Sequence, residues 1–168
     1  LQARFIADPL RLLDYCIIND GGCALIVTSA ELAKDLKKLP VNLSATATCT
    51  DFGPYYASDR FYREAVKDCY DRILPAAGVD LKDIKGAMIY DNFTPVVIFG
   101  LEGAGFADAG EGYSFIQGGT ITLGKGSLPV NTNGGHTSES YMQGWGLHIE
   151  AVRQLRGECG ARQIPNAD

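Results

Sequence analysis

Short apolar runs and alternating stretches along the chain predict β-strands. The run CALIVTS at 23–29 is rich in β-branched residues and follows the turn signal NDGG, which is typical of a buried strand. The stretch VNLSATATCT at 41–50 alternates apolar and polar positions, as a half-buried strand does. Two further short strands are predicted at GAMIY, 86–90, and around GTITL, 119–123.

Apolar residues at helical spacing predict helices between these strands. The segment 29–40 places Leu32 and Leu36 on one face, and Pro40 stops it. A longer helix follows Ser58 or Asp59, either of which can cap it, and is closed by Gly78. Apolar residues recur along this longer helix at i, i+4 spacing: Phe61, Ala65, Cys69 and Ile73.

Two more helices are predicted in the second half of the chain. One begins near Pro95, which suits a first helical turn, and dissolves into glycine from Gly100. The last runs from about Ser140 to Arg156 and ends at Gly157. Strands alternating with helices predict a single α/β domain, with helices on both faces of a mixed, mostly parallel sheet.

Composition and charge narrow the function classes. The 168 residues carry a formal net charge of −5 and no long basic block, which argues against nucleic-acid binding through phosphates. No apolar run approaches the roughly 20 residues that span a bilayer, and charges in the opening segment make a poor signal peptide. The five cysteines form no CxxC pair, which argues against a disulfide framework or a zinc site and favours a reducing cytoplasm.

Residues 131–146, NTNGGHTSESYMQGWG, stand out because a polar, glycine-rich stretch leads directly into a helical pattern. Three segments together resemble the C-terminal half of the thiolase superfamily. They are ADPLRLLDYCIINDGGCALIVTS at 7–29, MIYDNF at 88–93, and the stretch from 131 to the QLRG that ends at 157. Thiolases carry at these places a Pro-Leu helix with a DG-rich turn, an Asn-Glu-Ala-Phe or His-Asp-Cys-Phe motif, and an Asn-x-x-Gly-Gly loop followed by Gly-His-Pro.

The sequence departs from thiolases at the reacting positions. The Gly-His-Pro histidine falls on Tyr141, and the Asn or His of the middle motif falls on Tyr90. The segments that hold the two thiolase cysteines are not in this chain, and Cys159 receives no catalytic role. The pattern resembles most the thiolase-like lipid-transfer proteins of bacterial steroid breakdown, some of which are aldolases.

This resemblance implies a retro-aldol cleavage of the β-hydroxyacyl-CoA of a steroid side chain, with tyrosines as acid and base. Such a step requires two proton-transfer groups and one oxyanion site. A phenol has a reference pKa of about 10, so it acts as a base only beside hydrogen-bond donors or positive charge. Tyr90 ends a predicted strand, where α/β sheets bind ligands, and Tyr141 begins a predicted helix.

The implied site therefore has Tyr90 and Tyr141 as catalytic residues. Its predicted substrate-binding residues, among which the glycine N–H groups approach the thioester oxygen, are Asn92, Asn133, Gly134, Gly135, His136 and Ser138. No metal and no cofactor beyond the CoA thioester of the substrate are expected.

The resemblance also implies partners and an incomplete domain. Residues 1–168 match a thiolase-like C-terminal domain that lacks its closing strands and its N-terminal half, so we expect an exposed apolar face. A homodimer is expected, together with a small OB-fold, zinc-ribbon subunit that binds acyl-CoA.

Other interpretations remain open at this point. The chain fits a non-catalytic acyl-CoA or sterol carrier, an assembly module, or a thiolase-type acyltransferase once joined to its N-terminal half. Tyr90 and Tyr141 also fit simple packing roles, His136 a solvated loop, and Asp91 a residue that fixes the loop after its strand.

Overall fold

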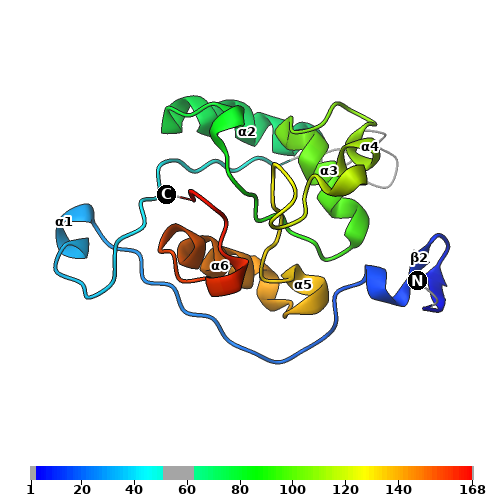
Figure 1. Ribbon diagram of the computed structural model, residues 1–168, viewed down its shortest axis with the longest axis horizontal. Coiled ribbons are helices and arrows are strands. Elements are labelled where there is room, and N and C mark those ends of the chain that lie inside the picture. Colours follow the sequence, from blue (N-terminus) through cyan, green and yellow to red (C-terminus); the bar gives the residue numbers. More distant parts are fainter. Residues whose placement is uncertain (1–2, 51–62, 168) are drawn as a thin grey trace.

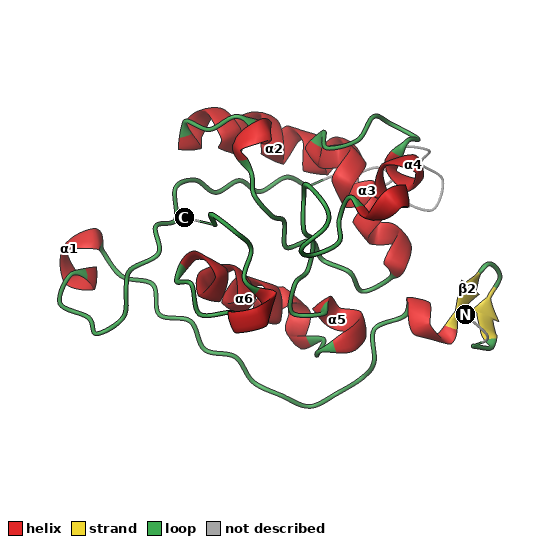
Figure 2. Ribbon diagram, viewed as in Figure 1, coloured by secondary structure: helices red, strands yellow, loops and turns green. Residues whose placement is uncertain are grey.

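Helices dominate the regular structure of the computed structural model, which describes residues 3–50 and 63–167 (Figure 1 and Figure 2). The helices are α1 (Ala30–Ala33), α2 (Arg63–Ala77), α3 (Thr94–Ala104), α4 (Gly112–Ile116), α5 (Gly135–Ser138) and α6 (Trp145–Leu155). The two strands are β1 (Phe5–Ala7) and β2 (Leu10–Arg11). The 3₁₀ turns are η1 (Leu12–Asp14), η3 (Leu81–Asp83), η4 (Gln117–Gly119), η5 (Met142–Gly144) and η6 (Gly160–Arg162).

The predicted parallel sheet is not formed among the described residues. Their only ladder joins β1 to β2 in an antiparallel hairpin. The segments 23–29, 41–50 and 119–123 carry no strand, and 86–90 contributes a single parallel bridge, Ala87 to Val130. An extended segment needs neighbours for its backbone N–H and C=O groups. The segments 23–29 and 41–50 have no backbone pairing with another extended segment in the described part of the chain, whereas Thr120 and Ile121 accept from the Leu128 and Val130 N–H groups without forming a ladder.

Helices α2 and α3 pack against each other through glycine (Figure 1). A Cβ on Gly103 would lie 2.7 Å from Val66 of α2, and one on Gly100 would lie 2.8 Å from Ile89. The prediction that the helix dissolves at Gly100 is wrong, because α3 continues to Ala104 before Gly105 turns left-handed at φ 84°. These glycines let the elements approach closely, and that packing outweighs their low helix propensity.

The core gathers around α3. Its buried centre is Ala87, Leu101 and Leu128. Partly buried side chains surround this centre: Ile84, Ile89, Val97, Phe106, Phe115, Ile116, Ile121 and Val130. The longer predicted helix is confirmed as α2, with Gly78 at φ 70° after it, whereas its predicted cap at Ser58 or Asp59 lies outside the described residues.

The N-terminal segment remains largely uncovered. Residues 15–29 run as a long loop along one side of the molecule, and the helix predicted over 29–40 is reduced to the single turn α1, capped by Ser29 (Figure 1). The expected exposed apolar face is present on this segment. Its exposed large side chains are Phe5, Ile6, Leu12, Leu13, Ile17, Ile18, Leu25, Ile26, Val27, Leu32, Leu36, Leu39 and Leu43.

The C-terminal part is held together by buried polar side chains of α6. Helix α6 begins at Trp145, later than predicted, because η5 interrupts the chain with positive-φ residues. On α6, Glu150 and Gln154 are buried and bind the residues that follow the helix: the Gln154 amide donates to the Arg162 carbonyl at 2.7 Å and accepts from the Ile164 N–H at 2.8 Å. The chain end is thereby attached to α6.

Candidate active site

Two phenols from distant parts of the sequence meet at one place. The hydroxyl oxygens of Tyr90 and Tyr141 lie 2.6 Å apart, in a hydrogen bond that either group can donate. Their rings are 6.2 Å apart between centroids and stand edge to face. Both side chains are half-buried. The sequence resemblance implied these two residues as the catalytic pair of one site, and the fold brings their hydroxyl oxygens into contact.

Tyr90 is positioned by the Asn131 side chain, which makes the two backbone hydrogen bonds that a neighbouring strand would make. The parallel pairing of Ala87 with Val130 is continued by Asn131, whose amide accepts from the Ile89 N–H and donates to the Ile89 carbonyl, both at 2.8 Å. Asn131 itself adopts a positive φ of 48°, which asparagine tolerates better than most residues. The backbone just before Tyr90 is therefore held on both of its polar groups.

Tyr141 is the N-cap of the 3₁₀ turn η5 and lies four residues before α6, the helix that it was predicted to begin. Its N–H donates to the side-chain oxygen of Asn19, at 3.0 Å, in the N-terminal segment. The next residues, Met142 and Gln143, have φ values of 34° and 50°. Such conformations cost about 1–3 kcal/mol for residues other than glycine and persist where the surroundings impose them.

Gln143 completes a cluster of three oxygen atoms. Its side-chain oxygen lies 3.3 Å from the Tyr90 hydroxyl and 3.2 Å from the Tyr141 hydroxyl, so it can accept from either one. One phenol can thus donate to the other while the second donates to Gln143. Gln143 is exposed, so the cluster opens to solvent. Sequence reasoning missed Gln143, because nothing in its spacing distinguishes it from its neighbours.

A buried carboxylate and imidazole lie beside the phenols. Asp91 is 5% exposed and His136 is 2% exposed. One oxygen of Asp91 accepts from the His136 backbone N–H at 2.9 Å and from its Nδ1 at 2.5 Å. The His136 ring is 4.5 Å from the Tyr90 ring and 5.2 Å from the Tyr141 ring, between centroids. The interpretation of His136 as a solvated loop residue is therefore wrong, and Asp91 does fix the loop after its segment.

The predicted glycine pair shapes this contact, but its N–H groups are already bonded. Gly134 has a φ of 106° and donates to the Asn131 carbonyl at 2.9 Å. Gly135 has a φ of 64° and donates to the Asn133 side-chain oxygen at 3.1 Å. Both donors serve the turn that leads into α5, so the expected approach of these N–H groups to a thioester oxygen has no support in the geometry.

The other predicted substrate-binding residues take separate positions. Asn133 binds Gly135 through its oxygen and the Glu139 carboxylate through its nitrogen, at 3.0 Å. Ser138 ends α5 and is exposed. Asn92 has a buried side-chain oxygen that no residue in 3–50 or 63–167 hydrogen-bonds, while its carbonyl accepts from the Cys16 N–H at 3.0 Å. A role for these residues in binding substrate stays a prediction.

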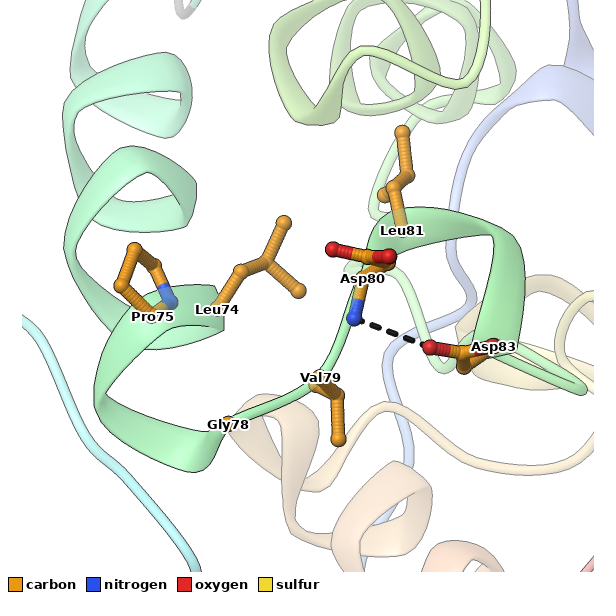
Figure 3. A pocket seen from close by; sticks show the side chains of 7 residues that line it. All are labelled: Leu74, Pro75, Gly78, Val79, Asp80, Leu81 and Asp83. Atoms are coloured by element: carbon orange, nitrogen blue, oxygen red, sulfur yellow. Dashed lines mark hydrogen bonds between the residues drawn. The ribbon is translucent and has the colours of Figure 1, made fainter.

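Of two surface cavities in the described part of the chain, one adjoins the site and the other lies away from it. One, of about 400 Å³, adjoins the phenols' turn and is lined by residues from the N-terminal segment, the 133–142 region and α6, among them Met142, Asn133 and Arg153. The other, of about 410 Å³, lies where α2 turns into η3 (Figure 3). Leu74, Val79 and Leu81 line it, and none of the predicted site residues does. It is therefore not part of the candidate site.

Within the ranges 3–50 and 63–167, no three histidine, cysteine or acidic side chains come together in a group that could hold a metal ion. Among those same residues, no helix has the length and hydrophobicity needed to cross a membrane.

Comparison with known proteins gives concordant matches. Residues 55–168 match the family model described as thiolase C-terminal domain-like. The 17-hydroxy-3-oxo-4-pregnene-20-carboxyl-CoA lyase of Mycobacterium tuberculosis is 40% identical over 163 residues, which are 93% of this chain and 42% of the relative. The steroid side-chain-cleaving aldolase of Thermomonospora curvata is 37% identical over 162 residues, covering 93% of this chain and 41% of that protein.

A solved structure has the same fold. The Ltp2-ChsH2(DUF35) aldolase superposes with a TM-score of 0.91 at 36% sequence identity, covering 98% of this chain and 44% of that chain. The chain thus spans less than half the length of the relatives that it matches.

Proposed function

The chain belongs to the thiolase C-terminal domain-like family, and from this premise we propose that it supplies the acid–base half of a carbon–carbon lyase. The substrate class is a β-hydroxyacyl-CoA, and the reaction is a retro-aldol cleavage. The observation that carries this proposal is the 2.6 Å contact between the hydroxyls of Tyr90 and Tyr141.

The cleavage conserves atoms and protons with two phenols alone. One phenolic oxygen takes the proton of the β-hydroxyl group, and the bond between the α and β carbons breaks to leave a ketone. The electron pair of that bond passes to the acyl-CoA fragment as an enolate, with charge on the thioester oxygen. The other phenol protonates the α carbon and is left as a phenolate. The hydrogen bond between the two then carries the proton taken from the substrate from the first phenol to the second, which restores the starting phenolate and phenol. No oxidant, metal or external nucleophile takes part.

Acyl transfer is a poorer fit for this chain. It requires a thiolate nucleophile, and thiolases pair theirs with a histidine at the position that Tyr141 occupies here. Cys159 does not replace that nucleophile, since burial, and after it the negative charge of Glu150, raise the pKa of its thiol. Tyrosines at both reacting positions suit proton transfer, and a retro-aldol step needs proton transfer and an oxyanion site but no nucleophile.

We extend the proposal to a steroid side chain as the acyl group. Two relatives are named for that chemistry and match 93% of this chain. The aldolase in the solved structure is named with a DUF35 partner, and we propose a partner of that kind here, an OB-fold and zinc-ribbon subunit that binds acyl-CoA. Association with an N-terminal thiolase half and a homodimeric assembly belong to the same proposal, and the uncovered apolar segment supports it.

The test is replacement of each phenol in the complete protein with its partner subunit. Tyr90→Phe and Tyr141→Phe remove a hydroxyl and keep the ring. We expect each to lower kcat on 17-hydroxy-3-oxo-4-pregnene-20-carboxyl-CoA by at least about 100-fold, with little change in substrate affinity. The matched control is Tyr113→Phe on α4, an exposed tyrosine. Full turnover in both phenol variants would end the lyase proposal, whereas tight acyl-CoA binding without turnover in the parent protein would favour the carrier.

A further inference from the structure

On the basis of the proposed function, we propose that Asp91 and His136 form a positioning pair that holds the two phenols at hydrogen-bonding distance. Neither residue is assigned to the chemical step. Their role is to fix, relative to each other, the two chain segments from which the reacting hydroxyls project.

The pair occupies the right places in the sequence for this role. Asp91 directly follows Tyr90, and His136 precedes Tyr141 by five residues on the connection that includes α5. Both hydrogen bonds of the Asp91 carboxylate that join these segments end on one residue, at the backbone N–H and at Nδ1 of His136. The segment of Tyr90 is thereby attached to the segment of Tyr141, and the attachment lies beneath the phenols.

The pair also fixes the orientation of the imidazole ring. A carboxylate accepts only from a protonated nitrogen, so the contact at Nδ1 places a proton there. The ring then packs against both phenols, with centroid distances of 4.5 Å to Tyr90 and 5.2 Å to Tyr141. A rotation of the imidazole would displace at least one phenol ring, because all three rings are in contact.

Gly135 makes this approach possible. A Cβ at this position would overlap the Asp91 carboxylate, and the φ of 64° is one that side-chain-bearing residues rarely adopt. Glycine here gives α5 its close contact with the carboxylate. The Asp91–His136 contact therefore requires a carboxylate at 91, glycine at 135 and histidine at 136 at the same time.

One atom of the pair indicates a role beyond stability. Nε2 of His136 is buried and has no hydrogen-bond partner among the described residues. An unsatisfied buried polar atom costs about 1–3 kcal/mol, and such atoms in native proteins call for an explanation. A contact present only for stability is served as well by an apolar side chain. An imidazole that is rigidly held by Asp91 on one side and touches both phenols on the other serves positioning.

The experiment uses the complete protein with its partner subunit and three variants. Asp91→Asn removes the charge, His136→Phe keeps a ring without hydrogen bonds, and His136→Asn keeps a donor near the Nδ1 position without the ring. Exposed residues of the same types give the matched controls Asp108→Asn and His148→Asn.

Two readouts are compared. The first is kcat and KM on 17-hydroxy-3-oxo-4-pregnene-20-carboxyl-CoA. The second needs no substrate: it is the deshielded proton NMR signal of the hydrogen bond between the phenols, assigned by its disappearance in Tyr90→Phe. We expect the three variants to lower kcat by about 10- to 100-fold with KM nearly unchanged, because misplacement of reacting groups by about 1 Å has this effect. We expect the signal to shift or vanish with them, and both controls to retain it.

The outcomes separate the two proposals. Normal kcat and an unchanged NMR signal in the pair variants, with turnover lost in Tyr90→Phe, would refute the positioning role and leave the lyase intact. A lost signal in the pair variants, with turnover unaffected by Tyr90→Phe, would retain the positioning role and refute the lyase. A parallel change of kcat and KM, with the signal preserved, would also count against positioning. If Asp91→Asn does not fold, the same two readouts on His136→Asn decide.

Discussion

Asp91 and Glu150 are both buried carboxylates, and the contrast between their partners separates the candidate site from the scaffold that supports it. Glu150, 1% exposed, accepts from Thr132 at 2.7 Å, from Gln154 at 3.2 Å and from the Arg162 guanidinium at 3.2 Å. It therefore joins three parts of the chain. Both hydrogen bonds that the Asp91 side chain accepts from the described residues come from His136.

The two carboxylates differ in how completely the polar groups around them are hydrogen-bonded, and this difference indicates their roles. Around Glu150 the donors are numerous and shared: Gln154 also donates to Thr132 at 2.8 Å and to the Arg162 carbonyl at 2.7 Å. A satisfied network of this kind rigidifies a structure. Around Asp91 the network stops at an imidazole whose Nε2 has no partner among the described residues, and two phenols lie against that imidazole. We infer that the first arrangement serves stability, whereas the second serves the positioning of the two phenols.

The strongest test of this contrast is removal of the Glu150 side chain. We expect Glu150→Ala to lower the free energy of unfolding by about 3 kcal/mol, because it removes the acceptor of Thr132 and one of the acceptors of Gln154, breaks the ion pair with Arg162 and opens a cavity. Chemical denaturation of the complete protein, followed by circular dichroism, measures this. Glu64→Ala, at an exposed position of α2, is the matched control and should change stability by less than about 0.5 kcal/mol. Turnover per folded molecule should be retained in Glu150→Ala; a selective loss of kcat would erase the distinction.

Asn131 tests the boundary between scaffold and site. Asn131→Ala deletes two hydrogen bonds to Ile89 and should cost about 2 kcal/mol of unfolding free energy, and it should also lower kcat since Tyr90 follows directly. Asn166→Ala is the control, because Asn166 has a similar positive φ of 56°, compared with 48° at Asn131. The difference between the two variants, taken from denaturation curves, isolates the hydrogen bonds from backbone strain. Equal losses in both would show that the Asn131 side chain does not support Tyr90.

Replacement of Gly135 tests whether the Asp91 carboxylate needs the close approach of α5. Gly135→Ala should lower the free energy of unfolding by about 1 kcal/mol more than Gly110→Ala. Both glycines have positive φ, but only a Cβ at 135 meets the carboxylate, whereas one at 110 meets nothing within 4 Å. Activity should fall in the first variant alone. Identical thermal and kinetic behaviour of the two variants would mean that the approach of α5 to Asp91 is not constrained.

The smallest expected effect is on acid stability. Burial of Glu150 disfavours its charge, but hydrogen bonds from Arg162, Thr132 and Gln154 outweigh this and hold its pKa below the usual value. A carboxyl whose pKa is lower in the folded state adds stability above its unfolded pKa of about 4.3, and this contribution is lost as the pH falls through the folded value. Between about pH 6 and pH 3, the free energy of unfolding should therefore decline more in the parent than in Glu150→Gln. Parallel curves would contradict this.

The helices were the part of the fold that the sequence predicted best. The repeat that predicts α2 is local, and Gly78 and Gly157, with φ of 70° and 68°, follow α2 and α6 as predicted. The strands failed for the opposite reason. A run such as 23–29 has strand composition, but whether it joins a sheet depends on a neighbour that its own letters do not specify. Resemblance to thiolases gave the family, which the match over 55–168 confirms.

At the candidate site, the sequence by itself determined which chemical groups are present: two phenols, an acidic residue next to one of them, and glycines that permit a tight turn. Only the tertiary structure decided that the Tyr90 and Tyr141 hydroxyls meet at 2.6 Å, that the Gln143 oxygen lies within hydrogen-bonding distance of each, and that His136 is buried against Asp91. The physical reason is that the hydrogen bond between the phenols joins residues 51 positions apart. Local propensity determines the backbone conformation of a residue. Contact between residues so far apart in the sequence depends on how the intervening segments pack.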